Sequence, residues 1–176
     1  RTMKIIWFIN LNQSPDINPS NLFTSNEIVN SNNKILVSSN DRFFIIDKNT
    51  GSITGRFSFS PLIRPIINQN YVFLITKNNF LISLDLNTNQ ILYSSDIDNQ
   101  ISNFLNIKKK KTVIKSFMLI NNEIFIFLKN SFILNFQSNG IIKSVKKLPA
   151  KLNSFPILID KFIYFLNNKN KLIVVS

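Results

Sequence analysis

A short phrase with the consensus Thr-Gly-x-Ile-x-aromatic recurs along the chain and constrains the fold more than any other feature. The copies occupy residues 2–7, 50–55, 88–93 and 139–144, and the second and third copies follow Asp47 and Asp85. Each copy combines a tight turn with the start of a short apolar strand. Repeated copies of one supersecondary unit predict a solenoid or a propeller, because a single unit cannot bury its apolar face alone.

A second pattern, two apolar strands joined by a polar turn, recurs between these phrases. It covers residues 35–47, 73–85, 124–136 and 163–175. Runs of β-branched and aromatic residues bounded by asparagine, aspartate and lysine favour β-hairpins over helices. The pairs Asn40-Asp41, Asn78-Asn79 and Asn130-Ser131 supply turn residues that tolerate positive φ. Each unit also has a short apolar segment before the hairpin, which gives four antiparallel strands in about 40 residues, the size of a propeller blade.

The predicted fold is therefore all-β, a single β-propeller domain over residues 1–176 with four-stranded antiparallel blades and very little helix. The expected blades span residues 26–59, 65–95, 112–147 and 155–176, and residues 1–9 form the outer strand of a preceding or closing blade. Residues 96–115 break the period and are expected to form a long solvated loop. Because the first copy of the phrase begins at residue 2, we expect either part of a larger ring or a ring closed by its own ends. The 16 residues between Ile9 and Asn26 favour about half of a ring of roughly eight blades. A closed four-bladed ring is the alternative.

The phrase predicts a structural role for each of its residues. Aspartate closes the turn by accepting backbone N–H groups, glycine takes positive φ, and the terminal aromatic residue packs between neighbouring blades. The residues with these roles are Asp47, Thr50, Gly51, Asp85, Thr88 and Gly140 in the turns, Trp7 and Tyr93 as aromatic residues, and Asn89 in place of a glycine. Gly55 and Ser144 stand where two copies lack the aromatic residue. We expect Phe57 or Phe59 to compensate for the first of them.

Composition excludes several classes of site. The sequence has no cysteine and no histidine, which rules out disulfides, Cys/His metal sites and catalytic dyads or triads that need those residues. The net charge is +12, but it comes from 17 lysines and four scattered arginines. Surfaces that bind nucleic acid favour arginine for its bidentate geometry, so we expect no nucleic-acid partner. The longest apolar runs are strand-sized, far shorter than the roughly 18 residues of a membrane helix.

The motif Asp-x-x-Thr-Gly-x-Ile-x-aromatic after a strand–turn–strand unit resembles the pyrroloquinoline-quinone-type propeller repeat. Within that group the pattern is most similar to the propeller lipoproteins of the outer-membrane β-barrel assembly machinery. The resemblance covers nearly the whole chain. It implies a non-enzymatic periplasmic scaffold that contacts the barrel-assembly protein and unfolded outer-membrane protein clients. Such a protein associates with the outer membrane as a lipoprotein only if a lipid anchor lies upstream.

A loop ahead of the second predicted blade is the candidate contact with the partner. Leu62, Ile63 and Arg64 place two apolar residues and a cation in this connection. The triplet resembles the Leu-x-Leu-Arg loop through which the assembly lipoproteins contact their partner, although Pro65 follows at once. Packing of Leu62 and Ile63 under the blade is the competing interpretation. An exposed blade edge, which could add a strand from an unfolded client, is a second candidate surface.

Two other functions use the same kind of blade. A fragment of a quinoprotein dehydrogenase would need a calcium site and a catalytic carboxylate beside the quinone, but the nine acidic residues are dispersed without the spacing of a metal-binding loop. A generic protein-binding propeller is the other alternative. We therefore expect no catalytic residue, no metal, no cofactor and no small-molecule substrate.

Overall fold

The computed structural model describes residues 3–11, 27–39 and 41–176. Fifteen strands and one helix are assigned among these residues. They are β1 (Val29–Ser31), β2 (Lys34–Ser39), β3 (Arg42–Asp47), β4 (Ile53–Phe57), β5 (Ile66–Asn68), β6 (Tyr71–Ile75), β7 (Phe80–Asp85), β8 (Gln90–Asp96), α1 (Ile97–Leu105), β9 (Ile114–Ile120), β10 (Glu123–Leu128), β11 (Phe132–Gln137), β12 (Ile142–Lys147), β13 (Ile157–Ile159), β14 (Phe162–Leu166) and β15 (Leu172–Val175). The prediction of an all-β fold is confirmed.

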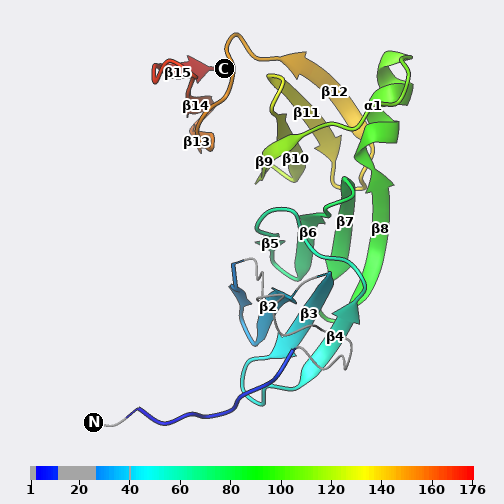
Figure 1. The fold of residues 1–176 in the computed structure, drawn as a ribbon, viewed down its shortest axis with the longest axis vertical. Helices are drawn as coiled ribbons and strands as arrows, with labels where there is room; N and C mark the ends of the chain where they lie inside the picture. The colour runs from blue at the N-terminus through cyan, green and yellow to red at the C-terminus, as the bar shows by residue number, and fades with distance from the viewer. Residues whose placement is uncertain (1–2, 12–26, 40) are drawn as a thin grey trace, which may run out of the picture. The chain divides into compact units, whose positions relative to one another are not determined.

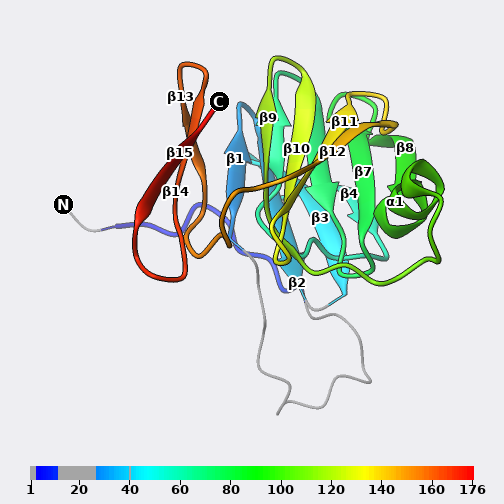
Figure 2. The same cartoon turned by 90° about the horizontal axis from the view of Figure 1, so that it is seen from above.

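The strands form four separate sheets in chain order (Figure 1). Three sheets have four strands, in the orders β1-β2-β3-β4, β5-β6-β7-β8 and β9-β10-β11-β12. The last sheet, β13-β14-β15, has three strands among the described residues and is coloured orange to red in Figure 2. Each strand pairs with its neighbour in sequence, as in a β-meander. This arrangement is consistent with a partial β-propeller.

Burial differs between the inner and outer strands of a sheet. In β3 four consecutive residues are buried, whereas β4 alternates between half-buried and exposed residues. A strand that is covered on both faces reads as a continuous apolar run, and a strand with one face in water alternates. The apolar runs in the middle of each predicted hairpin therefore mark the central strands.

The chain divides into two compact units, each built on a core between sheets. Unit 1 contains residues 1–78 and 82–92, and unit 2 contains residues 79–81 and 93–176. In unit 1 the core joins the first sheet to the second, through residues that include Phe43, Ile45 and Leu74. In unit 2 a smaller core of Phe127, Leu148, Leu152 and Phe165 joins the third sheet to the fourth. Packing of one sheet on the next buries the faces that a single blade would leave in water.

The last strand of a blade has the same irregularity in two sheets. In the first sheet the pairing steps from Ile45–Gly55 to Ile46–Ile53, and in the third from Asn135–Ser144 to Phe136–Ile142. One residue of the outer strand is therefore unpaired at the same place in both repeats, which is a β-bulge. The bulges show that the two repeats share backbone geometry although their sequences differ.

The structure corrects the interpretation of residues 96–115 as a solvated loop. Residues 97–105 form α1, because Asp96 caps its N-terminus and accepts a hydrogen bond from Asn99 N, while Asn106 ends it in the left-handed conformation. Ile97 and Ile101, one turn apart, are buried. A helix of nine residues gives too short a periodic pattern to stand out in the sequence.

The predicted outer strand at residues 1–9 also differs from the structure. Residues 3–10 belong to no strand, and residues 1 and 2 lie outside the described part of the chain. A strand assignment requires a hydrogen-bonded neighbour, and no described strand pairs with this segment. Its aromatic residue nevertheless packs against the first sheet, as described below.

Candidate functional site

The turn after β3 is closed by Asp47, which lies where the repeat predicts it. Asp47 Oδ1 accepts hydrogen bonds from Thr50 N at 2.9 Å, Thr50 Oγ1 at 3.0 Å and Asn49 N at 3.0 Å. These donors, led by the backbone N–H of Thr50, hold the pKa of Asp47 below its usual value although the carboxylate is exposed. Gly51 follows with a φ of +74°. The motif residues of this turn therefore hold its backbone conformation.

The other two turns of this kind use the same device with different residues. Asp85 Oδ1 accepts from Asn87 N at 2.7 Å, and Thr88 lies in the turn that follows. In the turn between β11 and β12, where Phe136 replaces the aspartate, Asn139 Oδ1 accepts from Ile141 N at 3.1 Å. In a different turn, between β14 and β15, Asn167 Oδ1 accepts from the backbone of Lys169 and Lys171. A short side chain with an oxygen acceptor closes each of these turns, and a full negative charge is not required.

Trp7 lies directly on the turn glycine of the first sheet. A Cβ built on Gly51 would be 2.7 Å from Trp7 Cδ2, so the ring occupies the space that a side chain would need. The indole Nε1 donates to Lys48 O at 2.9 Å. The half-buried ring packs with Ile9 and Leu11 against a small cluster of Val37, Phe44 and Ile46. Trp7 is thus held by both an apolar contact and a hydrogen bond.

Tyr93 repeats this arrangement in unit 2. A Cβ built on Gly140 would be 2.5 Å from Tyr93 Cε2, and Gly140 has a φ of +81°. The phenol oxygen is buried and has no hydrogen-bond partner among the described residues. Burial raises the pKa of Tyr93 well above its usual value. The aromatic residue of one repeat therefore covers the turn glycine of the next.

The junction between the first and second sheets, where the outer strand of one sheet meets the turn of the next, lacks the aromatic residue and is built from polar groups. Gly55 stands at the aromatic position, and the next turn has Asn89 instead of glycine, with a φ of 56°. Asn89 Nδ2 donates to Thr54 O at 3.1 Å, and its Oδ1 accepts from Lys34 Nζ at 2.9 Å. The space beside Gly55 is filled by Phe57, whose Cε2 lies 3.3 Å from a Cβ built there.

The aromatic side chains near Gly55 form a group within the core of unit 1. The rings of Phe57 and Phe59 lie 5.4 Å apart, and both lie near Phe43 at 6.1 and 6.2 Å. These separations are typical of attractive aromatic pairs. Phe57 and Phe59 thus supply apolar contact within the blade where the repeat lacks its aromatic residue.

The predicted contact loop is anchored by its backbone and exposes two of its three side chains. Pro61 forms an isolated bridge with Thr76, and Leu62 N donates to Ile75 O at 2.6 Å. Leu62 is 37% exposed, and Ile63 is half-buried but outside the main core cluster. The competing interpretation, in which Leu62 and Ile63 pack under the blade, fits the half-buried Ile63 but not the exposed Leu62.

Arg64 extends into solvent and pairs with an acidic residue that sequence analysis did not connect with it. Arg64 Nη1 lies 3.3 Å from Glu27 Oε2, and the two side chains are 63% and 70% exposed. Exposed ion pairs of this kind contribute about 0–1 kcal/mol. Glu27 is followed by Ile28, which is also exposed. No local signal could have revealed this pair, because the two residues are far apart in sequence and only the fold brings them together.

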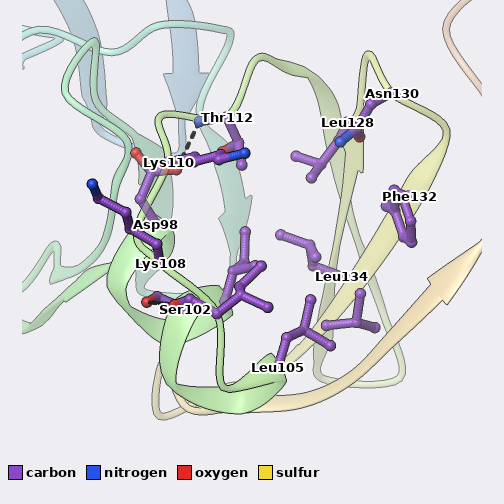
Figure 3. A pocket seen from close by; sticks show the side chains of 13 residues that line it. Asp98, Ser102, Leu105, Lys108, Lys110, Thr112, Leu128, Asn130, Phe132 and Leu134 are labelled. Carbon is purple, nitrogen blue, oxygen red and sulfur yellow. Dashed lines mark hydrogen bonds between the residues drawn. The ribbon is translucent and has the colours of Figure 1, made fainter.

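A cavity in unit 2 was also missed by sequence analysis. It has a volume of about 200 Å³ and lies between α1, the segment that follows the helix, and the sheet β9–β12 (Figure 3). The helix supplies Ile101 and Leu105, and the sheet supplies Phe132 and Leu134. Because the helix was not predicted, the space that it encloses could not be predicted either.

Acidic residues form no cluster suited to a metal ion in the described ranges. No group of three or more His, Cys, Asp or Glu side chains comes together there. The helix α1 is also too short to cross a membrane, and it is the single helix of the described residues.

Comparison with known proteins identifies the fold through solved structures only. No protein-family model and no curated protein matches the chain. The crystal structure of BamB from Moraxella catarrhalis is similar over 85% of this chain and 42% of that one, with 13% identity and a TM-score of 0.64. Two computationally designed proteins, Ika8 and Ika4, match with TM-scores of 0.60 at 11% and 10% identity, over 84% of this chain.

The similar region covers different shares of these structures. The similar region is 44% of the Ika8 chain but 88% of the Ika4 chain. The chain thus spans less than half the length of the BamB and Ika8 structures. At these identities the likeness establishes a propeller-like arrangement of antiparallel sheets and no more.

Proposed function

We propose that this chain is part of a non-catalytic propeller scaffold that works in the periplasm during assembly of outer-membrane β-barrel proteins. Two lines support the proposal: the repeat motif resembles that of the assembly lipoproteins, and the fold is similar to BamB. The observation that carries it is the loop of residues 61–64, where Leu62 and Arg64 point into solvent from an anchored backbone. The proposed partners are the barrel-assembly protein and its unfolded clients.

The loop has the physical properties of a binding anchor. Its backbone is already fixed by the hydrogen bond from Leu62 N and the bridge at Pro61, so association costs little additional conformational entropy. Arginine next to an exposed apolar side chain is a common hot-spot composition. The pair between Arg64 and Glu27 is exposed and weak, so a partner carboxylate could replace Glu27 at small cost.

The test is a binding measurement with a matched control. We expect the double variant Leu62→Ser with Arg64→Glu to bind the barrel-assembly protein at least tenfold more weakly, as expected when two contacts of about 1 kcal/mol each are lost. The control, Leu92→Ser with Arg42→Glu, alters an exposed leucine and an exposed arginine elsewhere in unit 1 by the same chemistry. Circular dichroism and thermal melting establish that both variants remain folded.

Each outcome separates the candidate functions. Unchanged binding by the folded loop variant would move the contact away from residues 62–64. Equal loss in both double variants would indicate a non-specific effect of charge. Failure of the native chain to bind the assembly protein, with retained binding to other proteins, would favour a generic protein-binding propeller. Micromolar binding of pyrroloquinoline quinone with calcium would favour the quinoprotein alternative.

A further inference from the structure

The cavity beside α1 is partly open to solvent and is lined mainly by apolar surface. Its lining includes Ile101 and Leu105 of the helix and Leu128, Leu134 and Val145 of the sheet (Figure 3). An apolar cavity of about 150 Å³ stays dry and accepts benzene. At about 200 Å³ this cavity has room for one aromatic ring or an alkyl chain of roughly six to eight carbons.

A rigid polar cluster holds the wall of the cavity in place. Asp98 Oδ1 accepts from Thr112 N at 2.9 Å and Thr112 Oγ1 at 2.6 Å, and its Oδ2 accepts from Asn79 Nδ2 at 3.0 Å. Asn79 Nδ2 also donates to Thr112 O. The cluster ties α1 to the segment that leads into β9. Asp98 lines the cavity, but both of its oxygens already accept hydrogen bonds, so it acts as a structural group.

The remaining charges at the cavity are positive. Lys108 and Lys110 contribute to its lining while their side chains are exposed (Figure 3). The neighbouring Lys109 is engaged with Asp96 at 2.6 Å and so does not compete for the same ligand. Unit 2 has 13 lysines and four acidic residues, so nine of the twelve net positive charges of the chain belong to it. A surface of this sign favours anions.

We propose that this cavity binds an amphipathic carboxylate whose apolar part is a single ring or a medium-length alkyl chain. The apolar part enters the space between α1 and the sheet, and the carboxylate stays at the mouth with Lys108 and Lys110. Asp98, Ser102 and Thr112 of the cavity wall form hydrogen bonds within the protein, so the ligand needs its single charged group only at the mouth. This site is independent of the contact loop in unit 1.

The experiment is a titration of the full chain with methyl-labelled isoleucine, leucine and valine, observed by NMR. Octanoate, octan-1-ol and octylamine share the chain length and differ in charge. We expect octanoate to shift the methyl signals of Ile101, Leu128, Leu134 and Val145, and to bind about fivefold more tightly than octan-1-ol. Octylamine should bind most weakly. Equal affinity for all three, or absence of shifts at these methyl groups, would overturn the proposal.

Two sets of variants keep the result specific. Lys108→Glu with Lys110→Glu should remove the preference for octanoate over octan-1-ol, while Lys169→Glu with Lys171→Glu makes the same charge change at exposed positions of unit 2 and should keep it. Val145→Phe should fill part of the cavity and weaken all three ligands. A second cavity in unit 2, lined by Phe125, Ile133 and Leu158 among others, provides a further control. Shifts confined to the methyl groups of Ile133 and Leu158 would also overturn the assignment.

Discussion

Unit 1 has two junctions at which residues of one repeat contact the turn of the next, one at Trp7 and one at Asn89. Both follow the same repeat pattern, but different chemical groups form the contact. At the first, an indole ring covers Gly51 and leaves no space for a side chain. At the second, Gly55 replaces the aromatic residue and the turn has Asn89, whose amide donates to Thr54 O. The comparison shows that the two positions vary together. An aromatic residue requires glycine in the following turn, and a residue without a ring leaves space that asparagine can use.

The same rule describes unit 2. Tyr93 covers Gly140, which is the aromatic type of junction. Gly140 lies in the turn between β11 and β12, the same place that Gly51 has between β3 and β4 and that Asn89, with a φ of 56°, has between β7 and β8. Asparagine tolerates positive φ at a small cost, so it can replace glycine where no ring is present.

The largest effect is expected for Gly140→Ala. The new Cβ would lie 2.5 Å from Tyr93 Cε2, and the residue would keep a φ of +81°. We expect a loss of about 2–4 kcal/mol, from the strain of positive φ and the displaced ring. Denaturant unfolding measures it. Gly55→Ala is the control, because its Cβ would be 3.3 Å from its neighbours and φ is not positive there. A control that costs as much as Gly140→Ala would contradict the comparison.

Trp7→Ala should destabilise unit 1 by about 2 kcal/mol. A fully buried tryptophan contributes about 3–5 kcal/mol, but Trp7 is half-buried, and the hydrogen bond from its Nε1 to Lys48 O adds to the loss. Thermal melting and denaturant unfolding provide the measurement. Phe8→Ala, which alters the neighbouring exposed aromatic residue, is the control and should change little. An unchanged melting temperature for Trp7→Ala would mean that the ring does not pack on the first sheet.

A double-mutant cycle sharpens the comparison between the two kinds of junction. In the native chain Gly51→Asn should be costly because the ring of Trp7 fills the space. In the Trp7→Gly background the same substitution recreates the Gly55–Asn89 arrangement and should cost less. We expect a coupling of about 1 kcal/mol between the two positions. Additive effects would show that glycine and the aromatic residue are independent.

The turns and hairpins could be predicted from the sequence because their causes are local. Asp47, Thr50 and Gly51 contact one another within one turn, so their spacing alone indicates the structure. The pair of Arg64 with Glu27 and the cavity at Leu134 depend on segments far apart in sequence. Those contacts arise only once sheets pack and α1 folds against them. Sequence could therefore identify residues 61–64 as a connection between sheets but not its acidic neighbour.

A smaller change, in the loss of stability as pH falls, is expected for Asp47→Asn. The donors of the turn lower the pKa of Asp47 in the folded state relative to the unfolded state. The stabilisation is therefore complete above the unfolded pKa of about 4 and is lost as pH falls through the lower folded value. Asparagine keeps an oxygen acceptor but does not titrate. The variant should be slightly less stable at neutral pH and lose less stability on acidification, as measured by melting between pH 7 and pH 2. An identical acid profile in the variant and the native chain would contradict this role.

The smallest change in stability is expected for Tyr93→Phe, which tests how the two aromatic residues Trp7 and Tyr93 differ. Trp7 has a hydrogen-bond partner for its polar atom, whereas the buried hydroxyl of Tyr93 has none among the described residues. Tyr93→Phe removes that hydroxyl and keeps the ring over Gly140, so stability at pH 7 should stay the same or rise by up to about 1 kcal/mol. Burial raises the pKa of Tyr93 in the folded state, so its share of stability is present below the unfolded value of about 10 and is lost as pH rises above it. Tyr93→Phe should therefore lose less stability between pH 9 and pH 11 than the native chain. A loss of more than about 1 kcal/mol at pH 7 would show that the hydroxyl has a partner, and the two aromatic junctions would then be alike.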